Sequence, residues 1–224
     1  PHGLLFWRSF TQFIGGMGII VFSIAILPML GMGGVQLFRA EVAGPVADKL
    51  TPRVKQTAKL LWGIYFGFVL LQTLILRIEG MPWFDSLCHA FGTMATGGFS
   101  TKSASILAYG GVIQWTIMFF MFCAATNFSL HYSFIAKRNI NYWKDREFTV
   151  YFLLILICGG LFFISLVNSD LYGFNFDTIR HTLFTSISLI TTTGFATENF
   201  ETWPAMSKTL TFFLLFVGGS AGST

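Results

Sequence analysis

Charged residues are scarce in this chain of 224 residues. They make up 11% of it, against roughly 25% in an average soluble domain, whereas 54% of the residues are hydrophobic and 17% are aromatic. So few charges leave too little polar surface for an ordinary soluble globule, and the composition predicts a membrane protein in contact with the lipid bilayer. The net charge of +4 is modest, and we expect no nucleic-acid partner.

Paired cysteines are also lacking. Cys88, Cys123 and Cys158 lie singly inside apolar segments and form no C-x-x-C pair, so the pattern indicates neither a disulfide framework nor a zinc site. We expect all three to be packing residues, and we expect no cofactor in this chain. The chain has no initial methionine or recognisable signal peptide and stops inside an apolar run, so we expect a piece of a longer polypeptide.

A short threonine and glycine motif is present twice. The two copies are 96 residues apart (194 − 98 = 96), and each follows an apolar, helix-compatible segment, 83–94 or 179–190. These segments are shorter than the about 20 residues needed to cross a bilayer, so we predict that both are re-entrant and surrounded by protein. The first copy is Ala95, Thr96, Gly97, Gly98, Phe99 and Ser100, and the second is Thr191, Thr192, Thr193, Gly194, Phe195 and Ala196.

A short helix that ends in a Thr/Gly strand is typical of potassium pores, in which backbone carbonyl oxygens replace the hydration shell of the ion. Glycine there permits backbone conformations closed to other residues and keeps side chains out of the ion path. One copy alone is typical of a turn, but two copies in register favour a pore with potassium as its substrate. The predicted potassium-binding filter positions are Ala95, Thr96, Gly97, Gly98, Thr191, Thr192, Thr193 and Gly194, supported by Phe99 and Phe195.

The remaining apolar runs predict several membrane crossings. The fold class we expect is an all-α polytopic membrane protein, built from repeated units of helix, re-entrant pore helix and helix around a pore. Pro82 is placed to begin the first re-entrant helix, and Gly15-Gly16-Met17-Gly18 is expected to break the first span. The predicted spans are 3–27, 60–76, 112–136 and 148–167, with a last one starting near Met206.

Basic residues mark the predicted cytoplasmic side. Two polar segments, 36–59 and 137–146, carry nine of the fourteen Lys and Arg residues, and these residue types are enriched in cytoplasmic loops. The opposite side has an excess of acids, with Asp85, Asp177 and Glu198 near the two pore mouths, where they would raise the local cation concentration. Taken singly, each of these acids is also typical of an ordinary solvated loop.

Small residues cluster in three of the apolar runs, at 15–18, 123–126 and 219–222. In the first two we expect close approach of helix backbones. The third is richer in glycine, and each glycine disfavours a helix by roughly 1 kcal/mol relative to alanine. We therefore predict that 218–224 is non-helical, which at membrane depth implies a cavity or a moving part.

Several stretches together resemble one known family. They are Phe6-Trp7-Arg8-Ser9 with Gly15-Gly16-Met17-Gly18, Lys49-Leu50-Thr51-Pro52-Arg53, Ala95 to Ser100, Thr126-Asn127-Phe128 with His131-Tyr132, Thr191 to Phe195, and Gly218 to Thr224. Over essentially its whole length, the chain is similar to the TrkH/TrkG-type subunits of bacterial potassium uptake systems, within the Trk/Ktr/HKT superfamily.

The resemblance implies four repeats around a single pore, with one filter glycine in each repeat. Gly98 and Gly194 match the filter glycines of the family. The loop that matches the proposed gate consists of Gly218, Gly219, Ser220, Ala221, Gly222, Ser223 and Thr224. The implied domains are 1–30, the inner helix of a preceding repeat; 31–58, a cytoplasmic segment; 59–136, a complete repeat; 137–146, a cytoplasmic loop; and 147–224, the next repeat, truncated within its inner helix.

The same resemblance implies a function and partners. The expected activity is potassium uptake across the bacterial inner membrane, by a multi-pass transport protein that is not an enzyme. Subunits of this family form homodimers and bind a cytosolic nucleotide-binding ring protein. The basic segments 36–59 and 137–146 would face that ring.

Other hypotheses concern the same residues. An intramembrane serine protease would use Ser220 in Gly-Ser-Ala as nucleophile, with His131 or His181 as base. This match is weak, and it leaves both Thr/Gly/Phe copies unexplained. A phosphate-binding loop at 218–224 would lack its lysine. The pairs Asp85/His89 and Asp177/His181 each suggest a metal site, but hydrogen bonding along the helix is the preferred interpretation.

Overall fold

The computed structural model describes residues 2–30, 50–137, 142–169 and 172–224. Within these ranges the chain is helical and contains no strand, which confirms the all-α fold class. Most of the predicted cytoplasmic segment 31–58 and part of the loop 137–146 lie outside the described residues. The helices are α1 (His2–Leu30), α3 (Leu50–Ile78), α4 (Trp83–Met94), η2 (Ser105–Ala108), α5 (Gly111–Ala124), α6 (Phe128–Lys137), η3 (Tyr142–Lys144), α7 (Arg146–Asn168), α8 (Phe176–Ile190), η4 (Phe200–Thr202) and α9 (Ala205–Leu214).

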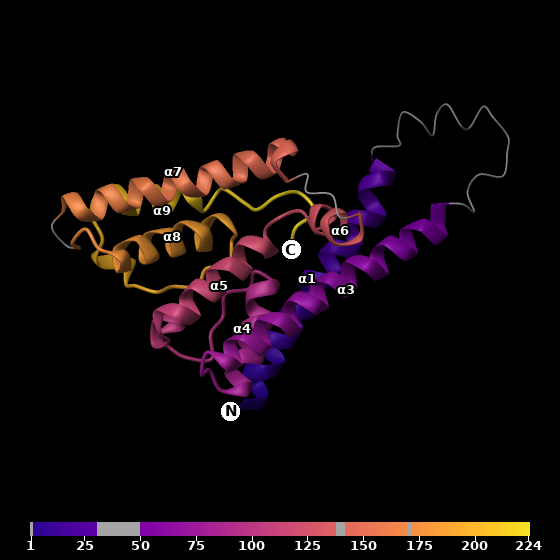
Figure 1. Ribbon diagram of the computed structural model, residues 1–224, viewed down its shortest axis with the longest axis horizontal. Coiled ribbons are helices and arrows are strands. Elements are labelled where there is room, and N and C mark those ends of the chain that lie inside the picture. The colour runs from indigo at the N-terminus through magenta and orange to yellow at the C-terminus, as the bar shows by residue number, and fades with distance from the viewer. Residues whose placement is uncertain (1, 31–49, 138–141, 170–171) are drawn as a thin grey trace.

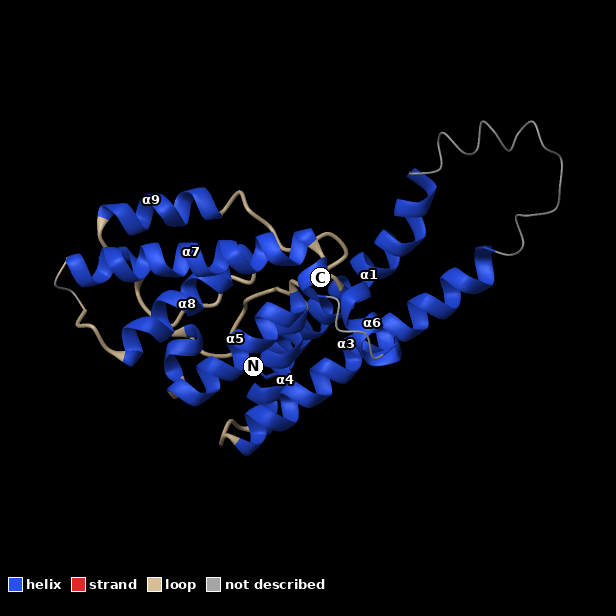
Figure 2. Cartoon of the chain, turned by 45° about the horizontal axis from the view of Figure 1, so that its top comes forward, coloured by secondary structure: helices blue, strands red, loops and turns tan. Residues whose placement is uncertain are grey.

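Two groups of helices are joined by α5. The short helix α4 packs against α3 and α1, and the short helix α8 packs against α7 and α9. The central helix α5 contacts α8 as well as α3 and α4 (Figure 1). The same grouping is visible in the turned view of Figure 2. Each predicted re-entrant helix therefore packs against three other helices, as a segment too short to cross the bilayer requires.

Local signals explain where the short helices begin. Pro82 is the residue before α4, and its carbonyl accepts from Ser86 N–H at 2.8 Å. Asn175 caps α8, since its side chain accepts from Thr178 N–H at 2.8 Å. A side-chain oxygen at this position satisfies one of the free N–H groups of the first turn. The predicted starts of both re-entrant helices are therefore close to the observed ones.

Among the described residues, two helices are long and apolar enough to cross a membrane, Ala58–Ile78 within α3 and Arg146–Asn168 of α7. A third crossing is possible if α5 and the first part of α6 form one span, although these two helices meet at an angle of 98°. The predicted span 112–136 was expected to be one helix, and this was wrong. Residues Ala125 to Asn127 interrupt it.

The expected break in the first helix was also wrong, because α1 runs without interruption from His2 to Leu30. Gly16 serves packing, as a Cβ added there would lie 2.7 Å from Tyr65 Oη and 3.0 Å from Ala95 Cα, whereas nothing lies within 4 Å of a Cβ added at Gly15 or Gly18. Close approach of helix backbones, the interpretation we gave for this small-residue cluster, is thus confirmed at Gly16.

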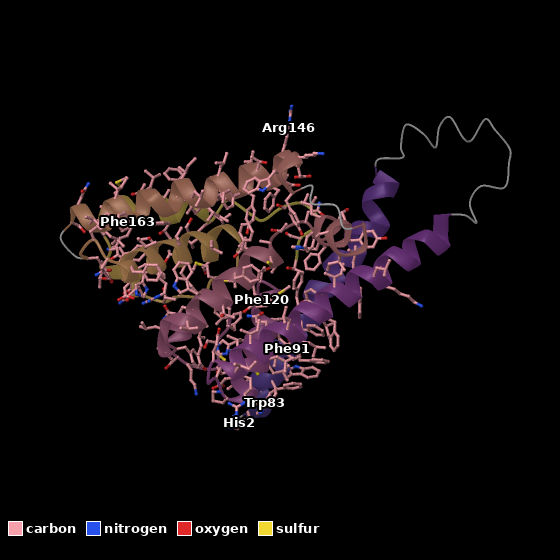
Figure 3. The ribbon with its side chains drawn as sticks, in the orientation of Figure 1. His2, Trp83, Phe91, Phe120, Arg146 and Phe163 are labelled. Atoms are coloured by element: carbon pink, nitrogen blue, oxygen red, sulfur yellow. The ribbon has the colours of Figure 1, made fainter. Side chains whose placement is uncertain are left out.

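Aromatic packing fills the space between α1, α3, α4 and α5. Phe91 and Phe120 belong to this buried cluster (Figure 3), and Phe13 lies between Tyr65 and Phe91 with ring centroids 5.3 and 4.7 Å away. This aromatic cluster holds α4 beside α1, which sets the position of the chain that leaves the end of α4.

The three cysteines are unpaired and buried, as predicted for packing residues.

Candidate functional site: two repeated pore limbs

The chain leaves α4 and α8 with the same backbone conformation. Thr96 and Gly98 have φ of 48° and 67°, and Thr192 and Gly194 have φ of 57° and 79°. Left-handed φ at both threonines is uncommon for residues with a branched Cβ. We call residues 95–98 the first limb and 191–194 the second limb. Both are non-helical, at the positions predicted for the filter.

The hydrogen bonds of the two limbs also correspond, at the spacing of 96 residues. Thr96 N–H donates to the Thr93 carbonyl and Thr192 N–H donates to the Leu189 carbonyl, both at 3.0 Å. Gly98 N–H donates to the Gly92 carbonyl at 3.4 Å, and Gly194 N–H donates to the Ser188 carbonyl at 3.1 Å. The limb N–H groups therefore turn back and satisfy carbonyls at the end of each short helix.

The limb carbonyl groups are in the opposite situation. Among the described residues, none of the main-chain oxygens of 95–98 or 191–194 accepts a hydrogen bond. Backbone oxygens without a donor inside a membrane protein need water or a cation. Eight carbonyl oxygens in two adjacent limbs thus offer the chemistry of an ion-coordinating filter.

The two limbs lie against each other. A Cβ added at Gly98 would come 1.6 Å from the Thr193 carbonyl oxygen. Beyond the limbs, the Ala196 carbonyl accepts from Ile106 N–H at 3.1 Å, and Ala196 N–H donates to Ser105 Oγ at 3.1 Å. These contacts join the outer segments of the two repeats, so both limbs border the same space.

The two phenylalanines predicted to support the filter differ in their surroundings. Phe195 is buried in the core, whereas Phe99 is 53% exposed. Arg8 of α1 covers Phe99, with its guanidinium carbon 4.9 Å from the ring centroid, and donates to the Ser100 carbonyl at 2.7 Å. Sequence reasoning did not assign Arg8 to the site, because it lies about 90 residues away from the limb.

A second residue of α1 also approaches the first limb. A Cβ added at Gly97 would lie 2.6 Å from Cδ of Gln12, and the buried Gln12 Oε1 has no hydrogen-bond partner in the described part of the chain. Only glycine leaves room for Gln12 at this place. Helix α1 therefore supports the first limb through both Arg8 and Gln12.

The pairs considered as metal ligands are hydrogen-bonded elsewhere. His89 Nδ1 contacts the main-chain carbonyl of Asp85 at 2.7 Å and Nε2 contacts Ser100 Oγ at 2.9 Å. Asp177 pairs with Arg180 at 2.5 Å. Bonding along the helix, the preferred interpretation, is thus what the structure shows for His89. Across the residues that the structure describes, no three His, Cys, Asp or Glu side chains converge as metal ligands do.

The segment before α8 makes one further, partly buried contact. The Tyr172 hydroxyl donates to Glu198 Oε2 at 3.2 Å. Burial, together with the negative charge of Glu198, raises the pKa of the Tyr172 phenol above its usual range. The phenol therefore stays protonated and keeps donating to the carboxylate.

The predicted gate segment is non-helical, as expected, since α9 ends at Leu214. It is bonded to the break between α5 and α6. Ser220 N–H donates to the Ala125 carbonyl at 2.9 Å and Thr224 Oγ1 donates to the Ala124 carbonyl at 2.9 Å. Gly222 accepts from Phe128 N–H at 3.2 Å. Each irregular segment thus satisfies backbone groups that the other leaves free.

The arrangement does not form a protease site. Ser220 Oγ is buried and has no hydrogen-bond partner among the described residues. His131 contacts Tyr142 Oη at 3.0 Å and the Cys123 carbonyl at 2.9 Å, so both its ring nitrogens are engaged. His181 contacts Thr197 instead. Neither histidine makes the bond to serine that nucleophilic catalysis requires.

Similarity to known proteins shows the family of this chain. The family model described as "Cation transport protein", named TrkH, matches residues 1–224. The chain belongs to the TrkH family. It is 42% identical over its whole length to the Trk system potassium uptake protein TrkH of Vibrio parahaemolyticus, and 36% identical to TrkG of Escherichia coli, covering 47% of each relative.

A solved structure supports the same assignment. The chain is similar, with a TM-score of 0.86 and 36% sequence identity, to the crystal structure of the potassium transporter TrkH from Vibrio parahaemolyticus. The match covers 100% of this chain and 45% of that one. The chain thus spans about half the length of the TrkH relatives that it matches.

Proposed function

We propose that the protein containing this chain takes up potassium across the bacterial inner membrane, and that the two limbs form half of its filter. The observation that carries the proposal is the set of eight limb carbonyls without donors among the described residues. The limbs are held by N–H groups, of which those at 95/191, 96/192 and 98/194 make corresponding bonds. Rings of backbone carbonyls are the established way to replace the hydration shell of potassium. Potassium is then the substrate of the site, and the chain needs no cofactor.

The proposal includes a gate and two partners. Residues 218–224 act as the gate, which is supported by their non-helical backbone and by their bonds to the broken helix. The resemblance to Trk-type subunits supports a homodimer and a cytosolic nucleotide-binding ring protein. The ring would bind on the side of the basic segments, where α7 begins with Arg146.

Uptake by cells tests the proposed function. A strain without potassium uptake systems of its own should grow at low external potassium only when it carries the full-length gene. Growth at high potassium serves as the control, because it should not depend on the gene. Normal amounts of the protein in the membrane, with no potassium uptake, would contradict the proposal.

Thiol labelling tests the proposed orientation. In the full-length protein with its native cysteines replaced by alanine, a cysteine at the exposed Trp143 should resist membrane-impermeant reagents added to intact cells. A cysteine at the exposed Ser103, in the turn after the first limb, should react rapidly. Figure 3 shows Arg146, close to Trp143 in the chain, and Trp83 at opposite edges of the molecule. Labelling of Trp143→Cys from outside would invert the orientation.

A further inference from the structure

Each short helix is tied to the chain beyond its limb by a pair of side-chain contacts. In the first repeat of the motif, Thr101 Oγ1 donates to Asp85 Oδ1 at 2.6 Å, and Lys102 Nζ lies 3.3 Å from Asp85 Oδ2. Asp85 is in the first turn of α4 and is 6% exposed. The carboxylate thus joins the start of α4 to the residues three and four positions after Gly98.

The second repeat contains the same tie with other residues. His181 Nδ1 contacts Thr197 Oγ1 at 3.0 Å, and His181 Nε2 lies 3.4 Å from Glu198 Oε1. His181 is 7% exposed and Thr197 is fully buried. Thr197 and Glu198 are again three and four positions after the limb glycine, Gly194.

All three members of the tie correspond at the spacing of the limbs (181 − 85 = 96, 197 − 101 = 96, 198 − 102 = 96). The threonine is the same in both repeats, but the places of the carboxylate and of the nitrogen-bearing side chain are exchanged. The helix supplies the acid and the loop supplies the base in the first repeat, whereas the helix supplies the imidazole and the loop supplies the acid in the second. Different residue types thus make the same contact in the two repeats. This indicates that the fold requires the contact and not particular residues.

The surroundings of the two ties differ in two respects. Arg180 Nη2 lies 3.2 Å from His181 Nε2, and Arg180 is itself held by Gln114 at 2.9 Å and by Asp177. The corresponding position in the first repeat is Phe84 (180 − 96 = 84). Glu198 also accepts from Tyr172. The first tie is therefore the simpler one to exchange.

We infer that Asp85 with Thr101 and Lys102, and His181 with Thr197 and Glu198, are positioning residues that set the spacing of the limb carbonyls and so the selectivity of the filter. The inference rests on the proposed potassium function. Each tie closes a loop of 16 residues that contains the whole limb. Without the tie, this loop is no longer closed and the limb can widen. A ring of carbonyl oxygens whose width adapts to the ion discriminates less between potassium and sodium.

Pair exchange in the full-length protein tests the inference. Asp85→His and Lys102→Glu, each alone, should lower the potassium-to-sodium flux ratio in liposomes about tenfold, a typical coupling between neighbouring residues. The double variant, which builds the second tie in the first repeat, should recover the ratio to within about twofold of the unmodified protein. Glu201→His and Lys208→Glu make the same types of change at exposed outer positions and should leave the ratio unaltered.

A second pair of variants tests the threonine without a change of charge. Thr101→Val removes the hydroxyl bonded to Asp85 and should lower the ratio, whereas Thr101→Ser keeps it and should preserve the ratio. A double variant no better than the worse single variant, or a normal ratio for Thr101→Val, would overturn the inference.

Melting temperatures of the same purified variants separate this inference from the proposed function. The double exchange should restore the melting temperature that each single change lowers, whichever ion the pore conducts. If the unmodified protein did not prefer potassium but the double exchange restored the melting temperature, the potassium function would be wrong and the ties would stand. If the unmodified protein preferred potassium but the double exchange restored neither property, the ties would be wrong.

Discussion

Gly98→Ser in the full-length protein is expected to lower the preference for potassium over sodium by about tenfold or more. The backbone at Gly98 is left-handed, with φ of 67°, and a Cβ would lie 1.6 Å from the Thr193 carbonyl oxygen. A left-handed backbone costs a residue with a side chain roughly 1–2 kcal/mol, and 1.4 kcal/mol corresponds to a factor of ten. The clash must also displace a carbonyl of the neighbouring limb, so both limbs lose their geometry.

Flux of potassium and of sodium into liposomes measures this effect. Gly194→Ser should act in the same direction, because φ at Gly194 is 79°. Gly110→Ser is the matched control, since nothing lies within 4 Å of a Cβ at that position and its φ is negative. Unchanged discrimination in a well-folded Gly98→Ser protein would show that this glycine is not part of the filter.

Deletion within 218–224 is expected to raise ion flux about tenfold or more, while selectivity stays largely intact. The minor state of a two-state protein is typically populated at about 0.1–10%. With the open state as the minor one, loss of the closed state raises the open population about tenfold or more. In the part of the chain that the structure describes, a single hydrogen bond joins the limbs to this segment, from Thr96 Oγ1 to the Thr224 carbonyl at 3.4 Å. Flux should also depend less on the proposed cytosolic ring protein.

A smaller change tests the same gate without removing residues. Glu147, at the start of α7, accepts from Ala221 N–H at 2.6 Å. Glu147→Gln weakens this charge-assisted bond, so flux should rise by less than in the deletion. Glu201→Gln is the control, as Glu201 is exposed in η4. A deletion variant that folds normally and shows unaltered flux would rule out the gate.

The sequence predicted the elements that local signals define. Pro82 before α4 and the threonine and glycine residues after Met94 mark both ends of that helix, and its predicted bounds, 83–94, are the observed ones. The spacing of 96 residues predicted the position of the second limb, because threonine and glycine residues also follow the end of α8. In both repeats, the information lies within a few residues of the boundary.

Features that depend on distant contacts were missed. Ala125 and Thr126 are compatible with a helix, and the break there is compensated by Ser220 and Thr224, about 100 residues away. At 15–18 the sequence predicted both a break in the helix and close approach of backbones, and only the second is observed, where Gly16 meets Tyr65 and Ala95. The ties were missed although their signal was present, since Asp85 was paired with His89 along one helix instead of being compared with His181 across the repeat.

The bonds between the broken helix and the glycine-rich segment also order the assembly of the protein during synthesis. Ala124 and its partner Thr224 are 100 residues apart, and ribosomes add about 5–20 residues per second. After they are synthesised, the carbonyls of Ala124 and Ala125 therefore remain without their final hydrogen-bond donors for on the order of 5–20 s. In that interval water or the insertion machinery must satisfy them, because lipid cannot. The bend between α5 and α6 acquires its final partners only after α7, α8 and α9 have been made, so late repeats complete the folding of early ones.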